Sequence, residues 1–236
     1  MPDQDRVDSL IDEADEALAE GDTERALERF EQALEIEPEH WGASLGRVEC
    51  LHLLWRTSDA LQEIRALAPS GNDDDDPERL ELEGEILEVT GDFDTADRLF
   101  ALAHQADAKA FPLPTRTTVD DFRAILDKVL ESLPDVIRSA IQEVPVIVES
   151  KPKRAIAERA PHITPEVLGL FVGATLADKI VATSGYPNVV MLFQRNLERA
   201  GRSRTEVARE IKITLLHEYG HYLGFDEEEL EHLGLG

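Results

Sequence analysis

The sequence is poor in cysteine, methionine and aromatic residues, and it contains no long apolar run. Its 236 residues include one cysteine, Cys50, which excludes an internal disulfide framework and favours a reducing compartment. No stretch approaches the roughly 20 apolar residues that a membrane-spanning helix needs. The acidic start, Met1 to Asp8, lacks the cationic and apolar segments of a secretion signal. We therefore expect a cytoplasmic protein without membrane association.

Basic residues are also scarce, and this excludes a nucleic-acid-binding surface. The chain has 24 Lys and Arg against 50 Asp and Glu, a net charge of -26, which repels phosphate backbones and anionic lipids. The excess of acidic residues is uneven, because residues 1–111 carry a net charge of -22 and residues 112–236 a net charge of only -4. Pro112 and Pro114 interrupt helix where the composition changes. We expect two domains, 1–110 and 118–236, joined by a linker at 111–117.

The first domain has the pattern of a helical repeat. Four residues recur after 70 positions: Gly21, Ala26, Phe30 and Ala33 return as Gly91, Ala96, Phe100 and Ala103. Between these copies Ala60 and Ile64 fit the same frame, but Trp55 stands where the turn glycine belongs. The alanines are expected where two helices approach closely, and the glycines in the turn inside each helical hairpin.

This pattern resembles tetratricopeptide repeats, whose period is about 34 residues. The resemblance implies about three stacked helical hairpins that present a surface to a peptide or protein partner. The alternative is a plain helical spacer. Because the repeats are so acidic, a partner that meets their charged faces should be basic.

The second domain contains an H-E-x-x-H motif at His217 to His221. Ser203 and Glu206 form a possible capping box, and an apolar residue every fourth position indicates that a helix continues from there. Histidines four positions apart lie on one helix face, so both imidazoles can reach one Zn²⁺ at about 2.0–2.1 Å. Glu218 projects at about 100° to His217 and can serve as the general base for a metal-activated water.

The residues after the motif supply a possible third zinc ligand. Gly224 can end the helix in a left-handed turn, and the acidic run from Asp226 to Glu229 follows. Two nitrogen ligands and one oxygen ligand would leave a coordination position for water. Asp226, Glu227 and Glu231 are each possible from the residues alone.

From His217 to Glu227 the chain resembles the small bacterial zincin-like metallopeptidases, which pair H-E-x-x-H-x-x-G-x-x-[D/E] with a compact α+β domain. The resemblance implies that His217, His221 and Glu227 hold zinc and that Glu218 is the catalytic base. Both methionines, Met1 and Met191, precede the motif, so the methionine turn of metzincins is absent and a minimal zincin is expected. The predicted fold class is therefore α+β, with an all-α repeat region first.

Three further features have open interpretations. The apolar stretch from Val189 to Phe193 is either an edge strand that pairs with an extended peptide or core sheet. The basic stretch from Lys151 to Pro161 is a flap over the cleft, a contact for the acidic repeats or a solvated loop. Tyr186, Tyr219 and Tyr222 are candidate hydrogen-bond donors to an oxyanion. Cys50 is expected in the core of the repeats.

The sequence thus predicts a zinc-dependent peptidase that acts on a peptide or protein substrate, with repeats that dock a substrate or adaptor. The alternative is a protein-interaction scaffold whose zinc site is structural or vestigial. A closed four-coordinate site would favour the scaffold, and an exchangeable water would favour the enzyme.

Overall fold

The computed structural model describes residues 2–67, 76–158, 162–173 and 188–232. The chain forms two compact units. Unit 1 comprises residues 1–113 together with residues 153–165, and unit 2 comprises residues 114–152 and 166–236. Among the described residues, no helix is both long and apolar enough to span a membrane.

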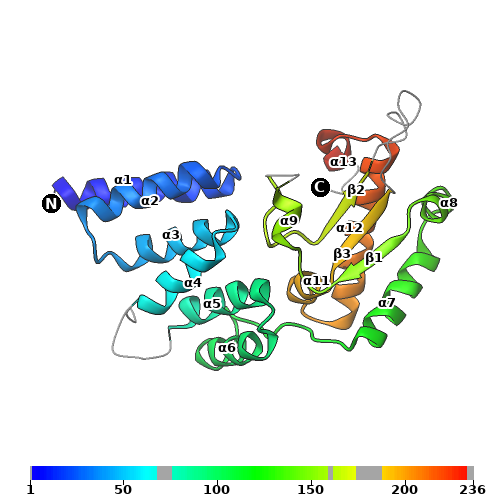
Figure 1. The fold of residues 1–236 in the computed structure, drawn as a ribbon, viewed down its shortest axis with the longest axis horizontal. Helices are drawn as coiled ribbons and strands as arrows, with labels where there is room; N and C mark the ends of the chain where they lie inside the picture. The colour runs from blue at the N-terminus through cyan, green and yellow to red at the C-terminus, as the bar shows by residue number, and fades with distance from the viewer. Residues whose placement is uncertain (1, 68–75, 159–161, 174–187, 233–236) are drawn as a thin grey trace. The chain divides into compact units, whose positions relative to one another are not determined.

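Residues 2–106 of unit 1 form a repeat array of helices that pack as successive antiparallel hairpins (Figure 1). They are α1 (Pro2–Ala19), α2 (Thr23–Ile36), α3 (Trp41–Leu53), α4 (Thr57–Ala66), α5 (Pro77–Thr90) and α6 (Phe93–Ala106). Each helix packs against the next along the chain, as expected for a linear array. The prediction of three helical hairpins is confirmed.

The turns inside the hairpins have the left-handed backbone that the repeat pattern predicts. Gly21 and Gly91 have φ of 79° and 87°, values that glycine adopts without steric cost. Asp22 and Asp92 follow them, and each carboxylate accepts a hydrogen bond from the main chain as an N-cap of the next helix. Trp55, which replaces glycine in the second hairpin, also has a positive φ, at 60°.

Close helix packing explains the small residues of the array. Ala26 and Ala96 are fully buried, as predicted from their recurrence. A Cβ added to Gly46 would lie 2.3 Å from the Phe30 ring, so this aromatic side chain requires a glycine in the neighbouring helix. Cys50 is also fully buried in this core, as predicted.

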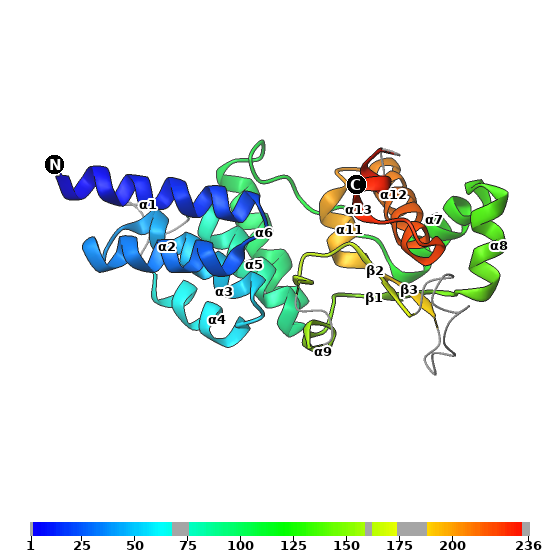
Figure 2. The same cartoon turned by 90° about the horizontal axis from the view of Figure 1, so that it is seen from above.

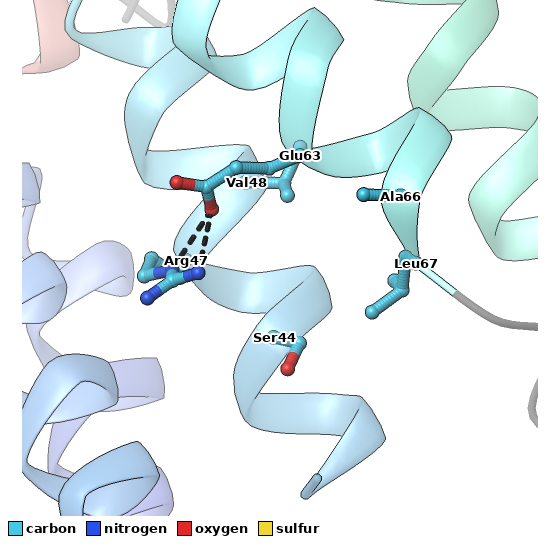
Figure 3. A pocket seen from close by; sticks show the side chains of 6 residues that line it. All are labelled: Ser44, Arg47, Val48, Glu63, Ala66 and Leu67. Carbon is cyan, nitrogen blue, oxygen red and sulfur yellow. Dashed lines mark hydrogen bonds and ion pairs between the residues drawn. The ribbon is translucent and has the colours of Figure 1, made fainter. Parts of the chain in front are cut away.

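A small hollow of about 190 Å³ lies between α3 and α4 (Figure 3). The Arg47 guanidinium and the Glu63 carboxylate point toward each other across it, with a shortest distance of 2.8 Å. The hollow is lined by Ser44, Arg47, Val48, Glu63, Ala66 and Leu67.

Unit 2 has a three-stranded sheet with helices packed on it. The strands are β1 (Val146–Glu149), β2 (Gly169–Val172) and β3 (Val189–Phe193). The helices are α7 (Val119–Ser132), α8 (Asp135–Glu143), α11 (Gln194–Ala200), α12 (Arg204–Leu223) and α13 (Glu227–His232). Helix α12 packs against β2 and β3, and α7 and α11 pack against α12 (Figure 2). The predicted α+β class is confirmed.

The strand order is β1-β3-β2, with β3 parallel to β1 and antiparallel to β2. Strand β3 therefore lies in the centre of the described sheet, and the edge-strand interpretation of Val189 to Phe193 is wrong. Its apolar character reflects burial, since Val190, Leu192 and Phe193 are fully buried. The edges of the described sheet are β1 and β2.

The start of unit 2 is tied to α11 through a buried carboxylate. Glu198 is 1% exposed, and one of its carboxylate oxygens accepts hydrogen bonds from the Thr117 main chain, the Thr117 hydroxyl and the Gln194 amide. The Arg116 guanidinium lies 3.4 Å from the other oxygen. These contacts satisfy a carboxylate that would otherwise be costly to bury.

Candidate metal centre

Helix α12 carries the histidine motif, and both of its ends follow from local sequence. The Ser203 side chain accepts a hydrogen bond from the Glu206 main chain, as the predicted cap requires. The Glu206 carboxylate in turn accepts from the main-chain N–H of Arg202. Gly224 ends the helix with φ of 100°, and its N–H donates to carbonyls of the last turn. Local signals thus place both ends of the helix.

The structure brings the two histidines of the motif together. The Nε2 atoms of His217 and His221 lie 2.9 Å apart, and their rings meet edge to face with centroids 4.5 Å apart. Two nitrogens bound to one tetrahedral Zn²⁺ at 2.0–2.1 Å would be about 3.3 Å apart. The observed separation is close to that value, so small side-chain rotations suffice to place both nitrogens on one ion.

The other ring nitrogen of His221 faces a backbone carbonyl. His221 Nδ1 lies 3.3 Å from the Phe225 carbonyl oxygen, which the left-handed turn at Gly224 brings back toward the helix. A proton on Nδ1 leaves the Nε2 lone pair free to bind a metal. Such a hydrogen bond also fixes the orientation of a ligand histidine. The two imidazole nitrogens and this support therefore fit two of the ligands of a zinc ion.

Glu218 lies between the two histidines in sequence, and its carboxylate is anchored to the sheet. It is 7% exposed, and its Oε2 accepts a hydrogen bond of 2.6 Å from the main-chain N–H of Phe171 on β2. One carboxylate oxygen is therefore anchored to the edge strand β2.

Gly169 makes the close approach of β2 to α12 possible. A Cβ at this position would lie 2.4 Å from Thr214 Cγ2 and 3.1 Å from the Met191 carbonyl oxygen. The same Cβ would be 3.4 Å from Glu218 Cγ. Sequence analysis missed the roles of Gly169 and Phe171. A glycine inside an apolar strand was the available signal, because it marks a site of close backbone approach.

The acidic run after the motif forms the start of α13. Asp226 accepts a hydrogen bond from the Glu229 main chain, and the Glu229 carboxylate accepts one from the Asp226 main chain. This reciprocal pair is a capping box, so the Asp226 carboxylate already has a structural partner. The side chains of Glu227 and Glu231 lie outside the described part of the structure.

Helix α13 packs back onto α12 at Gly220 inside the motif. A Cβ on Gly220 would lie 2.4 Å from Leu230 Cδ2, so only glycine allows this contact. Leu230 is fully buried by it. Since Glu227 begins α13, the Gly220–Leu230 contact sets the position of the Glu227 backbone next to α12.

The described tyrosines of the motif do not serve as donors to an oxyanion. The Tyr219 hydroxyl donates to the Val144 carbonyl oxygen at 2.6 Å, and the Tyr222 hydroxyl donates to Glu143 at 2.8 Å. Both side chains are almost fully buried, and burial raises the pKa of Tyr219 well above its usual range. The prediction is wrong for these two residues, which instead join α12 to the end of α8 and the residue after it. Tyr186 lies outside the described residues.

Unit 2 is thus an α+β domain organised around a histidine-bearing helix, and unit 1 is an array of helical hairpins. Residues 141–236 match the family model of zincin-like metallopeptidases. Residues 17–86 match a tetratricopeptide repeat model. Both resemblances predicted from the sequence are thereby confirmed. No curated protein shows a significant match to the chain.

Proposed function

We propose that the protein is a zinc-dependent peptidase in which His217, His221 and Glu227 hold the metal and Glu218 is the general base. The observation that carries this proposal is the convergence of the His217 and His221 Nε2 atoms, 2.9 Å apart on one face of α12. The proposal assigns residues 118–236 to catalysis and residues 1–110 to docking of a substrate or adaptor. A cytoplasmic location belongs to the same proposal, since the single cysteine is a buried thiol.

Glu227 is favoured as the third ligand over Asp226. The Asp226 carboxylate caps α13, and recruiting it would leave main-chain donors of the first turn without their partner. Glu227 stands one residue further on, at the first residue of α13. A carboxylate there would complete two nitrogen ligands and one oxygen ligand, the set found in zinc peptidases with an open position.

Zinc, when bound, supplies Lewis-acid polarisation of the scissile carbonyl and lowers the pKa of a water nucleophile toward neutrality. Glu218 takes the proton from the attacking water and delivers it to the leaving amine. The Phe171 N–H binds Oε2 of this carboxylate and so restrains its orientation. The edge strand thus holds the base in one orientation.

Strand β2 also offers a binding surface for an extended peptide. The Phe193 N–H donates to the Leu168 carbonyl, so main-chain groups at Leu168 and Leu170 face β3. Those of Gly169 and Phe171 face the opposite edge, which is the edge next to Glu218. We propose that a substrate pairs along this edge with the main chain of Gly169 and the carbonyl oxygen of Phe171, since the Phe171 N–H is already bound to Glu218.

The test is a comparison of the wild-type protein with Glu218→Gln on a mixed peptide pool. Both proteins should carry about one zinc per chain, and only the wild type should cleave peptides. Mass spectrometry of the products would report the cleavage positions. If both proteins retain zinc and neither cleaves any peptide, the site is structural and the protein is a repeat-based scaffold.

A further inference from the structure

One segment of the chain belongs to a different compact unit from the residues on either side of it in sequence. Residues 153–165 follow β1 and precede β2, yet they belong to the compact unit formed by the helical repeats. The segment begins with the short helix α9 (Arg154–Ala157). Residues 153–158 of the basic stretch therefore belong to the unit of the repeats, in agreement with one of the three interpretations of that stretch.

The contact is made by the tryptophan that replaces a turn glycine. The Trp55 indole N–H donates to the Ile163 carbonyl oxygen at 2.7 Å. Trp55 is 4% exposed and has φ of 60°, a backbone conformation that residues with a Cβ rarely adopt. The equivalent turns use Gly21 and Gly91, which bear no side chain. The array tolerates the strained backbone at Trp55. The tryptophan side chain, which a glycine would lack, binds a segment distant in sequence.

Charge favours the same pairing. Residues 153–165 contain three basic residues and one acidic residue, a net charge of +2. Residues 1–111 carry a net charge of -22. A basic segment next to a strongly acidic array gains electrostatic attraction.

The residues that flank the segment are held by one side chain of unit 2. The Lys151 ammonium donates to Asn196 Oδ1 at 2.5 Å, and Asn196 Nδ2 donates to the Val167 carbonyl oxygen at 2.7 Å. Lys151 and Asn196 are 6% and 4% exposed. Asn196 therefore fixes the points where the segment leaves the sheet domain and returns to it.

We propose that the turn between α3 and α4, anchored by Trp55, is a docking site that the repeat array uses for residues 153–165 of its own chain. The ligand is a basic segment recognised through a main-chain carbonyl at Ile163. The proposal holds whether or not the protein cleaves peptides.

The experiment compares hydrogen exchange of the full-length wild type with that of Trp55→Phe and Trp41→Phe. Phenylalanine at 55 keeps an aromatic ring but removes the indole N–H. Trp41 is a matched control, because its indole nitrogen is buried without a hydrogen-bond partner in the described structure. Peptides covering residues 162–165 should exchange about 2- to 10-fold faster in Trp55→Phe, the effect of one lost hydrogen bond. Trp41→Phe should leave that exchange unchanged.

A second variant separates docking from folding. Trp55→Gly restores the turn residue of the other hairpins, so the array should stay folded by circular dichroism while the segment is released. Trypsin should then cut after Lys153 and Arg154 faster than in the wild type. Equal exchange in the wild type and Trp55→Phe, or an equal rise in Trp41→Phe, would overturn the proposal.

Discussion

The carboxylate of Glu218 accepts a hydrogen bond from the main-chain N–H of Phe171, 2.6 Å away across 47 residues of sequence. The bond joins the helix that bears the histidine motif to the edge strand of the sheet. It orients the proposed base with a main-chain donor that a substitution at Phe171 other than proline keeps. A change at Glu218 therefore tests the chemistry of the carboxylate without removing its anchor.

Glu218→Gln should abolish peptide cleavage and keep the metal. Glutamine retains an oxygen that accepts from Phe171 but cannot take a proton from water, so kcat should fall by about 10²- to 10⁴-fold. The measurement is steady-state cleavage of a peptide identified from the pool, with zinc content determined on the same samples. Activity near the wild-type level would show that another group is the base.

Gly169→Ala should lower both stability and kcat. The new methyl group would lie 2.4 Å from Thr214 Cγ2, and relief of this overlap should cost about 1–3 kcal/mol of unfolding free energy. Separation of β2 from α12 would also lengthen the bond between Phe171 and Glu218. Urea unfolding and peptide cleavage measure the two effects.

The matched control for that variant is the double substitution Gly169→Ala with Thr214→Ser. Serine lacks the Cγ2 atom that the new methyl group meets, and it keeps the hydroxyl. The double variant should recover part of the lost stability, with the 3.1 Å approach to the Met191 carbonyl remaining. No recovery would locate the strain at the main chain of β3 rather than at Thr214.

Local sequence signals predicted much of this architecture, and non-local contacts account for the rest. The cap at Ser203, the left-handed turn at Gly224 and the paired histidines depend on neighbours within a few residues, so spacing alone indicates them. The bond between Phe171 and Glu218 depends on which strand forms the sheet edge. Strand order cannot be read from periodicity, and this is why Val189 to Phe193 had two interpretations.

The capping role of Asp226 could have been predicted from the sequence. Asp226 and Glu229 have the spacing of a capping box, the same signal that located the start of α12 at Ser203. The acidic run was interpreted only as a source of zinc ligands. The contact between Trp55 and Ile163, which spans 108 residues, had no comparable local signal beyond the unusual residue in a glycine position.

Glu227→Ala should weaken zinc binding by about 10-fold or more, because a direct ligand is lost. Asp226→Asn is the control, since asparagine caps helices about as well as aspartate. Competition with a fluorescent zinc chelator gives the two affinities. If Asp226→Asn loses zinc and Glu227→Ala does not, the oxygen ligand is Asp226.

Gly224→Ala should weaken zinc binding in addition to lowering the free energy of unfolding. Alanine at φ of 100° is strained and should cost about 1 kcal/mol of unfolding free energy. Gly21→Ala is a matched control, because that glycine has φ of 79° and equally open space around its Cβ position. Both variants should lose similar stability in thermal melts. Only Gly224→Ala should weaken zinc binding, since it shifts the Phe225 carbonyl next to His221 Nδ1. Equal zinc affinity in the two variants would show that the Phe225 carbonyl does not support His221 as a zinc ligand.

Cys50 provides a test of alkaline stability that is independent of the metal site. Burial, with a smaller effect from Glu49, raises the pKa of its thiol from 9.0 to about 12. In the unfolded chain the thiol ionises near pH 9, so this preference for the neutral thiol stabilises the fold fully below that pH. The contribution should be lost progressively as the pH rises toward 12, and urea unfolding between pH 8 and pH 10.5 measures the start of that loss. Cys50→Ala should lower stability at pH 8 but show a weaker decline with pH. A thiol that reacts with Ellman's reagent in the native protein as fast as in urea would contradict its burial.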